Sequence, residues 1–399
     1  MNDDYQPDEG ALLVLNAGSS TLKYEFFGYT KGQPLIRREA GVIEGIGEAG
    51  AEVASHEEAL RQVLDQPERA TTRGSLLGVA HRVVHGGEEF SRATLIDASV
   101  LEGIRQAIPL APLHNPANLA GIEACRLGWP GLPQVAVFDT AFHQTIPEAA
   151  SHYGLGLSPE GQPKIRRYGF HGTSYASVCR RLSAQWALPV EALNLIVLHL
   201  GNGASACAIQ GGRSLDTSMG MTPTAGLVMG TRSGDLDPGI VLHWLRHEGC
   251  SVDDIDRRIN REGGLKGLSG HQDMRKLLAA LDQGEDRAEL ALGVFVHRIR
   301  HYLGAYRAAL PELTALVFTG GIGEHAPLVR ARILDRLVHL GFELDALRNA
   351  ATPEGLSAIH KVGAKIPILV MPAAEEHEMA CQMCELIGLS PLDLADGAP

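Results

Sequence analysis

The chain has 399 residues, 45% of them hydrophobic and 21% charged, a composition typical of a globular protein with two or three domains. This composition excludes a disordered, collagen-like or fibrous chain. The 35 Lys and Arg against 47 Asp and Glu give a formal net charge of −12, which disfavours nucleic acid and anionic lipid as partners. No apolar run is long enough for a membrane helix, and Met1 to Gly10 has no signal-peptide pattern, so a cytoplasmic protein is expected.

Apolar runs and helical patterns alternate along the chain, which predicts an α/β protein with parallel or mixed sheets. The predicted strands are Leu12–Leu15, Val135–Phe138, Leu195–Leu200, Ala315–Thr319 and Ile366–Met371. The clearest helix runs from Asp286 to Leu310, where apolar residues recur every three or four positions, and a second pattern runs from Leu328 to Leu340. Gly41 to Gly50 is predicted as a surface loop and Ser390 to Pro399 as a frayed tail.

Six cysteines are scattered through the chain, and only Cys381 and Cys384 are closely spaced. They lie in a helical segment without a second pair or a nearby histidine pattern. We therefore expect two packed helical thiols, and a zinc or redox role is the alternative.

A faint internal repeat joins the two halves of the chain. The small-residue turn from Asn16 to Ser20 leads into an apolar run at Leu22–Phe27, and the turn from Gly201 to Ser205 leads into Ala206–Ile209. If the halves face each other, two turns rich in glycine and serine would offer backbone amides to phosphate oxygens. Two ordinary hairpins are the alternative interpretation.

A third glycine-rich segment, Gly320 to Glu324, follows a predicted strand and precedes a predicted helix. This order is common at nucleotide sites, because a helix N-terminus attracts phosphate. The spacing matches neither a Walker A loop nor a dinucleotide fingerprint.

Four polar side chains stand in apolar or glycine-rich surroundings: Arg82, Asp139, His171 and Arg232. Arginine suits bidentate contacts with carboxylate or phosphate, and Asp139 follows a strand end, where α/β ligand sites gather. Taken singly, each arginine could be a surface ion pair, His171 a bonded core histidine and Asp139 a turn cap. It is improbable that all four residues have only these structural roles when three loops suited to phosphate occur in the same chain.

With these segments in place, the sequence resembles the acetate/propionate kinase family. The matching segments run in family order from residue 15 to residue 324, with a weak extension to Glu376. They are LNAGSSTLKYEFF, HRVVHGG, LAPLHNP, VFDTAFHQTIP, YGFHGTS, LHLGNGAS, LDTSMGMTP, MGTRSGDLDPG and FTGGIGE.

The resemblance implies two duplicated ribonuclease-H-like α/β domains with a nucleotide cleft between them, the acetate and sugar kinase/actin type. One domain would be residues 1–143 with 377–399, and the other residues 144–376. The implied reaction is reversible transfer of a phosphoryl group from ATP to acetate, giving ADP and acetyl phosphate. Mg²⁺ is the implied metal, with Mn²⁺ as an alternative, and the family resemblance implies a homodimer.

Family roles are carried over residue by residue. Asp139 resembles the carboxylate that orients acetate, Arg82 and Arg232 the arginines that hold acetate and the moving phosphoryl group, and His171 the histidine that stabilises the transition state, with His114 in support. Asn16 and Glu375 match the magnesium site. The implied nucleotide contacts are Ser19, Ser20 and Lys23 in the first phosphate loop, His199, Leu200, Gly201, Asn202 and Gly203 in the second, and Asp273, Met274, Arg275, Gly321, Ile322, Gly323, Glu324 and His325 around the nucleoside.

The acyl pocket matches Val84, Leu113, Phe170 and Pro223, whose bulky apolar side chains favour a short acid. One methylene in such a pocket is worth only about 1–3 kcal/mol, so a propionate or other short-chain acyl kinase is the first alternative. A non-catalytic nucleotide-binding relative and a generic α/β binding protein are the others.

Several positions depart from the family pattern. Ala373 and Ala374 replace a usual Thr-Asn pair before Glu375, His377 replaces an apolar residue, and His325 replaces an asparagine. In addition, Tyr175 replaces a histidine, and Thr224-Ala225 replaces Leu-Glu. None of these changes removes a predicted catalytic side chain, so activity is expected, with altered nucleotide or metal preference as the consequence to test.

Overall fold

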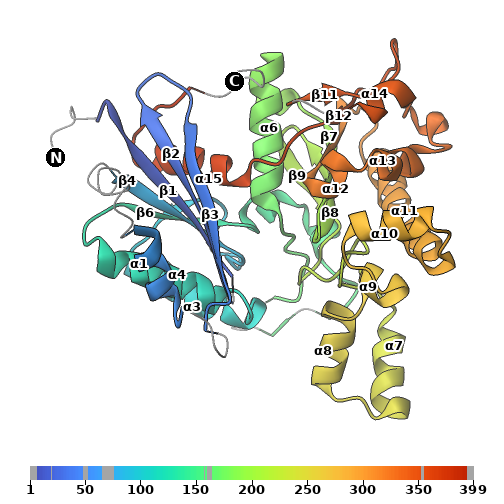
Figure 1. The fold of residues 1–399 in the computed structure, drawn as a ribbon, viewed down its shortest axis with the longest axis horizontal. Helices are drawn as coiled ribbons and strands as arrows, with labels where there is room; N and C mark the ends of the chain where they lie inside the picture. Colours follow the sequence, from blue (N-terminus) through green and yellow to red (C-terminus); the bar gives the residue numbers. More distant parts are fainter. Residues whose placement is uncertain are drawn as a thin grey trace. The chain divides into compact units, whose positions relative to one another are not determined.

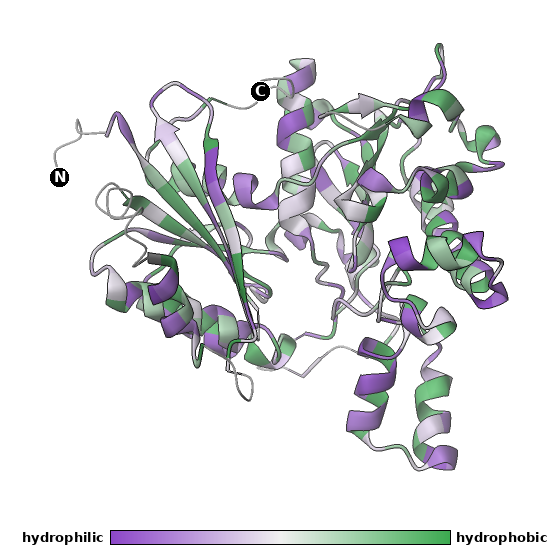
Figure 2. Cartoon of the chain, viewed as in Figure 1, coloured by the Kyte–Doolittle hydropathy of each residue, from purple (hydrophilic) through white to green (hydrophobic). Residues whose placement is uncertain are grey.

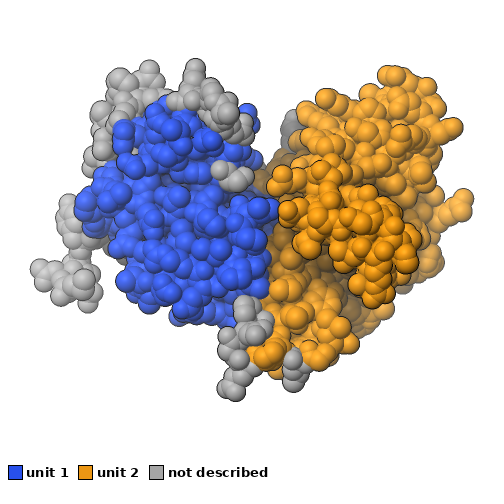
Figure 3. Space-filling model, turned by 90° about the horizontal axis from the view of Figure 1, so that it is seen from below, with its two compact units in different colours: residues 1–144, 171–187, 374–398 blue, residues 145–170, 188–373, 399 orange. Residues whose placement is uncertain are grey.

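The computed structural model describes residues 7–18, 20–47, 53–64, 76–156, 158–159, 164–351 and 355–392. The chain divides into two compact units, coloured separately in Figure 3. The first unit comprises residues 1–144, 171–187 and 374–398, and the second comprises 145–170, 188–373 and 399. The functional domains expected from the sequence, 1–143 with 377–399 and 144–376, stay a prediction.

In its described part, the first unit contains a six-stranded sheet in the order β3-β2-β1-β4-β6-β5 (Figure 1). The strands are β1 (Glu9–Ala17), β2 (Thr21–Thr30), β3 (Ile36–Glu44), β4 (Leu76–Val83), β5 (Thr94–Leu95) and β6 (Gln134–Phe138). β1, β4 and β6 run parallel, whereas β2, β3 and β5 pair antiparallel with their neighbours. The predicted loop at Gly41–Gly50 is therefore wrong for residues 41–44, which pair with β2, and residues 48–50 lie outside the described ranges.

Helices cover both faces of this sheet: α1 (His56–Leu64), α3 (Ala98–Gln106), α4 (Asn115–Gly128), α6 (Gly172–Trp186) and α15 (Glu375–Leu386), with 3-10 turns at Ile108–Leu110 and Ala141–Thr145. Successive side chains of β1 point to opposite faces of the sheet, so the strand packs against helices on both sides. Leu12 and Val14 pack with α15, whereas Leu13 and Leu15 pack with α1 and α4 on the other face. An apolar run without alternation thus marks a strand that is buried on both sides.

The second unit repeats this sheet. Its strands are β7 (Leu195–Leu200), β8 (Ala204–Gln210), β9 (Arg213–Thr217), β10 (Ala315–Thr319), β11 (Ser357–Ala358) and β12 (Ile368–Val370). Read from β9, the order β9-β8-β7-β10-β12-β11 matches β3-β2-β1-β4-β6-β5 strand for strand. The parallel and antiparallel pairings also correspond, so the predicted duplication is confirmed.

The second unit also contains nine α-helices among its described residues. They are α5 (Glu148–Ser151), α7 (Pro238–His243), α8 (Val252–Asn260), α9 (Gly264–Ser269), α10 (Met274–Asp282), α11 (Asp286–Ala309), α12 (Gly320–His325), α13 (Pro327–Leu334) and α14 (Ala346–Ala350), with 3-10 turns at Val190–Ala192 and Val338–Leu340 and a π-helical turn at Trp244–Glu248. Helix α11 confirms the strongest helical pattern and packs on β7 and β8.

Three local predictions need correction. The helix predicted over Leu328–Leu340 stops at Leu334, because Asp335 is extended and Arg336 takes a left-handed backbone with φ 61°. Gly320 to Glu324 is part of α12, a short helix that begins directly after β10, rather than a turn before a helix. Ser390–Leu392 also differ from a frayed tail, since Leu392 bridges to Pro34, whereas residues 393–399 lie outside the described ranges.

The thiols of Cys381 and Cys384 are buried in the α15 core, as predicted for packed helical thiols. Figure 2 shows hydrophobic residues concentrated in the strands of each unit. Among the described residues, none of the helices has the length and apolar character needed to span a bilayer.

Candidate active site

Polar side chains gather at the carboxyl ends of the parallel strands in the first unit. Asn16 stands near the end of β1, Arg82 near the end of β4, and Asp139 directly after β6. Parallel strands end at one edge of a sheet, so these residues meet there. The structure therefore brings together three of the residues predicted for the site.

Arg82 and Asp139 form a two-pronged ion pair at this edge. The Nε atom of Arg82 donates to Oδ1 of Asp139 at 2.9 Å, and its Nη2 donates to Oδ2 at 2.6 Å. Asp139 is 1% exposed. Burial disfavours the charge on Arg82, but the Asp139 carboxylate outweighs that effect and raises the pKa of Arg82 above its ordinary value. The guanidinium therefore stays charged, and its third nitrogen, Nη1, reaches the Asn16 side-chain oxygen at 3.4 Å.

Glu375, the first residue of α15, belongs to the same electrostatic cluster. Burial raises its pKa to about 7, and the carboxylates of Asp139 and Glu376 add to the effect, whereas Arg82 and Lys23 oppose it. Lys23 pairs with Asn16 across β1 and β2 and has an exposed side chain. The site thus holds carboxylates that repel one another and would be stabilised by a cation.

His171 is tied to Asp139 through its neighbour. Gly172 donates its backbone N–H to the Asp139 carbonyl oxygen at 2.9 Å, and a Cβ on Gly172 would collide with that oxygen. His171 itself precedes the first turn of α6 in a left-handed conformation with φ 59°, which is uncommon for a residue with a side chain. Such a strained position beside a buried carboxylate is typical of a functional residue.

Two asparagines hold this edge together, and sequence reasoning missed both. Asn118 donates to the Ala17 carbonyl oxygen at 2.7 Å and accepts from the Val84 N–H at 3.1 Å. Asn115 makes the same kind of pair with both backbone groups of His85. They are buried and three residues apart on α4, so they clamp the segments after β1 and β4. Two asparagines at helical spacing among apolar residues were the available signal.

The structure describes only part of the segment predicted as the first phosphate loop. Gly18 donates to the Thr21 carbonyl oxygen at 2.8 Å and accepts from His56 Nε2 at 2.7 Å, so His56 is a further supporting residue. Ser20 accepts from the backbone of Ile46, and Ser19 lies outside the described residues.

The other predicted residues of the first unit lie near the N-terminus of helix α4. His114 occupies the N-cap position of α4, the preceding Leu113 is 54% exposed, and Val84 is buried. The other two predicted pocket residues, Phe170 (buried) and Pro223 (half-buried), belong to the second unit. A common acyl pocket for the four therefore stays a prediction.

In the second unit, the loop after β7 meets the start of α12. His199 and Leu200 end β7, and the Gly201–Gly203 turn is closed by the Gly201 N–H to the Gly203 carbonyl oxygen at 3.0 Å. Gly320 has φ 76° and passes so close to Leu200 that a Cβ would lie 2.9 Å from its carbonyl oxygen. Gly230 in turn donates to the Asn202 carbonyl oxygen at 3.0 Å. Three predicted segments are thus brought together.

The α12 segment, which contains Gly321, Ile322, Gly323, Glu324 and His325, is held by an arginine that sequence reasoning missed. Arg330 is 1% exposed and donates to the carbonyl oxygens of Gly323 and Glu324, both at 2.8 Å. It also donates to the side-chain and backbone oxygens of Asn349 at 2.8 Å. Its sequence signal was weak, because α13 carries two arginines, Arg330 and Arg332, among apolar residues and only Arg330 is buried.

The other residues predicted to contact the nucleoside lie at a helix start and at the surface. Asp273 is the N-cap of α10, which begins at Met274, and its carboxylate accepts from the backbone and side chain of Arg275. The Arg275 side chain is 91% exposed, and that of His325 is 72% exposed.

Arg232 lies in a loop that is pinned by Asp235. Its Nη1 donates to the Pro223 carbonyl oxygen at 3.3 Å, so two predicted residues are in contact. Asp235 accepts from the Gly226 N–H at 2.8 Å and from the Tyr302 hydroxyl at 2.7 Å, and it lies 3.5 Å from Arg298 of α11. Helix α11 therefore fixes both ends of the Arg232 loop.

Three of the residues that depart from the family pattern have structural accounts. Tyr175 is fully buried and packs against the rings of Phe142 and His143. His377 packs edge-on against Phe27, and its Nδ1 is 3.6 Å from Cys381 Sγ. Ala374 is the N-cap of α15 without a capping side chain, and the acidic first turn of that helix favours its dipole instead.

Comparisons with known proteins agree with these observations. Residues 11–381 match the model of the acetokinase family. The chain is 46% identical to the acetate kinase of Sulfurovum sp. (93% of this chain, 97% of the relative) and 44% identical to that of Streptomyces coelicolor (95% and 97%). Two solved structures are similar to it, each at 36% identity. The acetate kinase of Porphyromonas gingivalis has a TM-score of 0.89 (95% of this chain, 100% of that chain), and a propionate kinase of Francisella tularensis has 0.83 (94% and 98%).

Proposed function

The chain belongs to the acetokinase family, and we propose that the family reaction, phosphoryl transfer from ATP to acetate, runs through the residues described above. It is a kinase that transfers phosphate to acetate. The observation that carries the assignment of roles is the buried Arg82–Asp139 pair at the carboxyl ends of β1, β4 and β6.

Acetate needs no base, because it is already ionised at neutral pH. What the reaction needs is alignment of a carboxylate oxygen with the phosphorus atom and cations that offset the charge on the transferring group. Arg82, locked in place by Asp139, would hold the acetate carboxylate, and Asp139 would orient it rather than accept a proton. Arg232 and His171, supported by His114, would stabilise the equatorial oxygens of the transition state.

The nucleotide contacts follow from the second unit. We assign the phosphates to the backbone around His199–Gly203, together with Ser19, Ser20 and Lys23 of the first loop, because tight turns with exposed amides suit phosphate oxygens. We assign the adenosine to Asp273, Met274 and Arg275 and to the segment from Gly321 to His325. The close approach of Gly320 to Leu200 supports a shared site for these two segments.

Mg²⁺ fits the Glu375 cluster. It binds through oxygen ligands and keeps several waters, and the mutual repulsion around Glu375 is what a divalent cation would relieve. Asn16 and Glu375 would hold it, and Mn²⁺, which takes similar ligands, is the alternative. When bound, the metal supplies positive charge to the phosphate oxygens.

The direct test is trapping of the acyl phosphate as a hydroxamate. Purified protein is supplied with Mg·ATP and with acetate, propionate or butyrate. We expect the highest kcat/KM for acetate, and a higher value for propionate would reassign the acyl pocket alone. Asp139→Asn should lower kcat about 100-fold or more by releasing Arg82. Asp97→Asn, an exposed helix-cap change, serves as the control. Wild-type kcat in Asp139→Asn would refute the assigned role.

Two further properties are part of the proposal. A homodimer is supported by the exposed apolar side chains of Ile240, Leu242 and Leu245 in and just after α7. Light scattering coupled to size exclusion tests it. A cytoplasmic location is supported by the six cysteines, all within the described ranges and all free, as is usual in a reducing compartment.

A further inference from the structure

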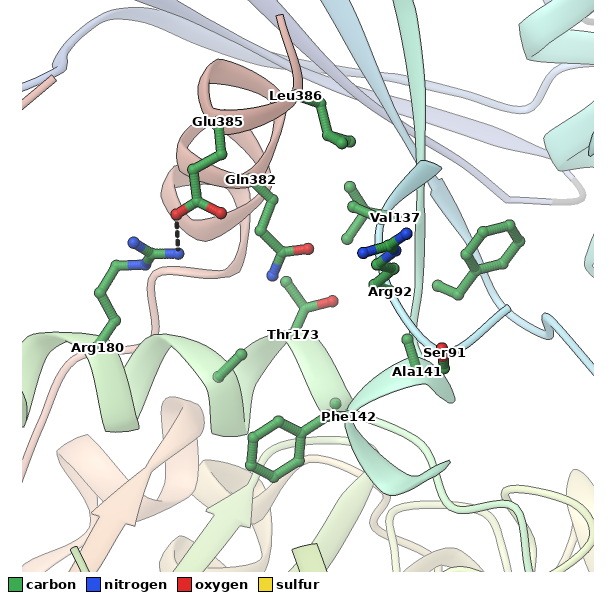
Figure 4. Close-up of a pocket in the computed structure, with 14 residues that line it drawn as sticks. Ser91, Arg92, Val137, Ala141, Phe142, Thr173, Arg180, Gln382, Glu385 and Leu386 are labelled. Atoms are coloured by element: carbon green, nitrogen blue, oxygen red, sulfur yellow. Dashed lines mark hydrogen bonds and ion pairs between the residues drawn. The ribbon is translucent and has the colours of Figure 1, made fainter. Parts of the chain in front are cut away.

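The first unit contains a pocket of about 390 Å³ that none of the proposed catalytic residues lines (Figure 4). Its walls come from the end of β6 and the turn that follows, from the first turns of α6, from the last turns of α15, and from Ser91–Ala93. The pocket therefore lies next to the candidate active site and is not part of it.

One wall of the pocket, at the N-terminus of α6, has features that favour an anion. Thr173, the second residue of α6, is 3% exposed, and its hydroxyl has no hydrogen-bond partner among the described residues. It sits in the first turn of a 15-residue helix, where the helix dipole favours negative charge. A buried hydroxyl without a partner is costly, so a ligand that bonds to it would be stabilised.

Arg92 supplies the cation. Its guanidinium is exposed, and among the described residues it has no ion-pair partner. Figure 4 shows Arg92 and Thr173 facing the same space from two sides of the pocket. The other arginine of the lining, Arg180, is already engaged, at 2.9 Å from Glu378 and 2.7 Å from Glu385. Arg92 is thus the cation that remains for a ligand.

The rest of the lining limits the ligand. Val137, Ala141 and Leu386 add apolar surface to the lining of the pocket. Glu385 also lines the pocket, but its ion pair with Arg180 leaves Arg92 as the uncompensated charge of the described lining, and one positive charge suits a monoanion better than a dianion such as phosphate. The lining therefore matches a singly charged ligand with an apolar body.

We propose that this pocket binds a small organic monocarboxylate. The carboxylate pairs with the Arg92 guanidinium and accepts a hydrogen bond from the Thr173 hydroxyl, while the apolar body packs against Val137 and Leu386. A pocket of this volume accommodates a body the size of an aromatic ring.

Benzoate is the probe, with benzamide as its neutral counterpart and inorganic phosphate as an anion without an apolar body. Binding to the full-length protein is measured by calorimetry and by saturation-transfer NMR. The variants are Arg92→Gln, Ala176→Leu, which fills the pocket, and Arg126→Gln, an exposed arginine of α4 that does not line it, as the matched control.

We expect wild type and Arg126→Gln to bind benzoate alike, and Arg92→Gln to bind it about tenfold or more weakly. Ala176→Leu should abolish binding, and benzamide should bind about tenfold more weakly than benzoate. Three results would overturn the proposal: no saturable benzoate binding by wild type, equal binding by Arg92→Gln and wild type, or phosphate binding as tightly as benzoate. Because Arg92 is exposed, its replacement tests the proposal even if Ala176→Leu does not fold.

Discussion

Replacing Tyr302 with phenylalanine removes one atom that connects α11 to the Arg232 loop. The Tyr302 hydroxyl donates to Asp235 at 2.7 Å, and Asp235 closes the loop through the Gly226 N–H. In Tyr302→Phe, the described partners that still hold the Asp235 carboxylate are that N–H and the more distant Arg298, at 3.5 Å. The loop should therefore become less well fixed, and Arg232 with it.

The size of the expected effect follows from the strength of the hydrogen bond between Tyr302 and Asp235. A hydrogen bond to a charged acceptor is worth about 1.5–3 kcal/mol, and the partial exposure of Asp235 places this one at the lower end. If this hydrogen bond helps to hold Arg232 in the position that stabilises the transition state, its loss should lower kcat for acyl phosphate formation about tenfold. The KM for ATP should change little, because the proposed nucleotide contacts lie elsewhere. Urea unfolding should show a loss of about 1 kcal/mol.

Tyr306, one turn further along α11, provides the matched control. Its hydroxyl is buried and has no hydrogen-bond partner among the described residues, so Tyr306→Phe should leave kcat unchanged and should not lower stability. An unchanged kcat in Tyr302→Phe would refute the proposed link between α11 and Arg232. An equal loss in both variants would show that ring packing, rather than the bond to Asp235, matters.

Three further predictions concern buried groups. Burial lowers the pKa of His81 to about 4, so below pH 6.5 the unfolded chain binds a proton that the folded chain does not. The free energy of unfolding should therefore fall by about 3 kcal/mol between pH 7 and pH 4. In urea titrations at several pH values, His81→Gln should remove this contribution to the pH dependence of the unfolding free energy. Arg330→Met should lower stability by about 3 kcal/mol or more and raise the KM for ATP, because it leaves buried oxygens around α12 without donors; an unchanged melting temperature would contradict this. Gly172→Ala should lower kcat about tenfold or more, because its Cβ pushes α6 away from Asp139; wild-type kinetics would show that the contact is unimportant.

The sequence was sufficient for the buried parallel strands β1, β6, β7, β10 and β12 and for the place of Asp139 at a strand end, whereas part of β3 was predicted as a loop. Continuous apolar runs identify strands that are buried on both faces, and Asp139 could be placed because a polar residue after such a run stands at a strand end. The ends of helices were harder to predict from the sequence. Nothing in the apolar pattern of Leu328–Leu340 indicates that Arg336 takes a left-handed conformation.

The supporting residues could not be predicted for a different reason. Asn115, Asn118 and Arg330 act by bonding to backbone atoms of segments distant in sequence or across a turn. Any segment offers the same backbone groups, so no residue type at the other end reveals the partner. Such contacts become visible only when the fold is known.

The position of α15 has a consequence for how the protein is made. This helix follows β12 of the second unit, yet Met379, Cys381 and Met383 pack against Leu12, Val14 and Val135 of the first. While the ribosome is still translating the second unit, the sheet of the first has one apolar face uncovered. Such a face is a target for chaperones and for aggregation. A nascent chain cut short before α15 therefore leaves its earliest-made unit without a complete core, and a premature stop late in the gene should damage the beginning of the protein as much as its end.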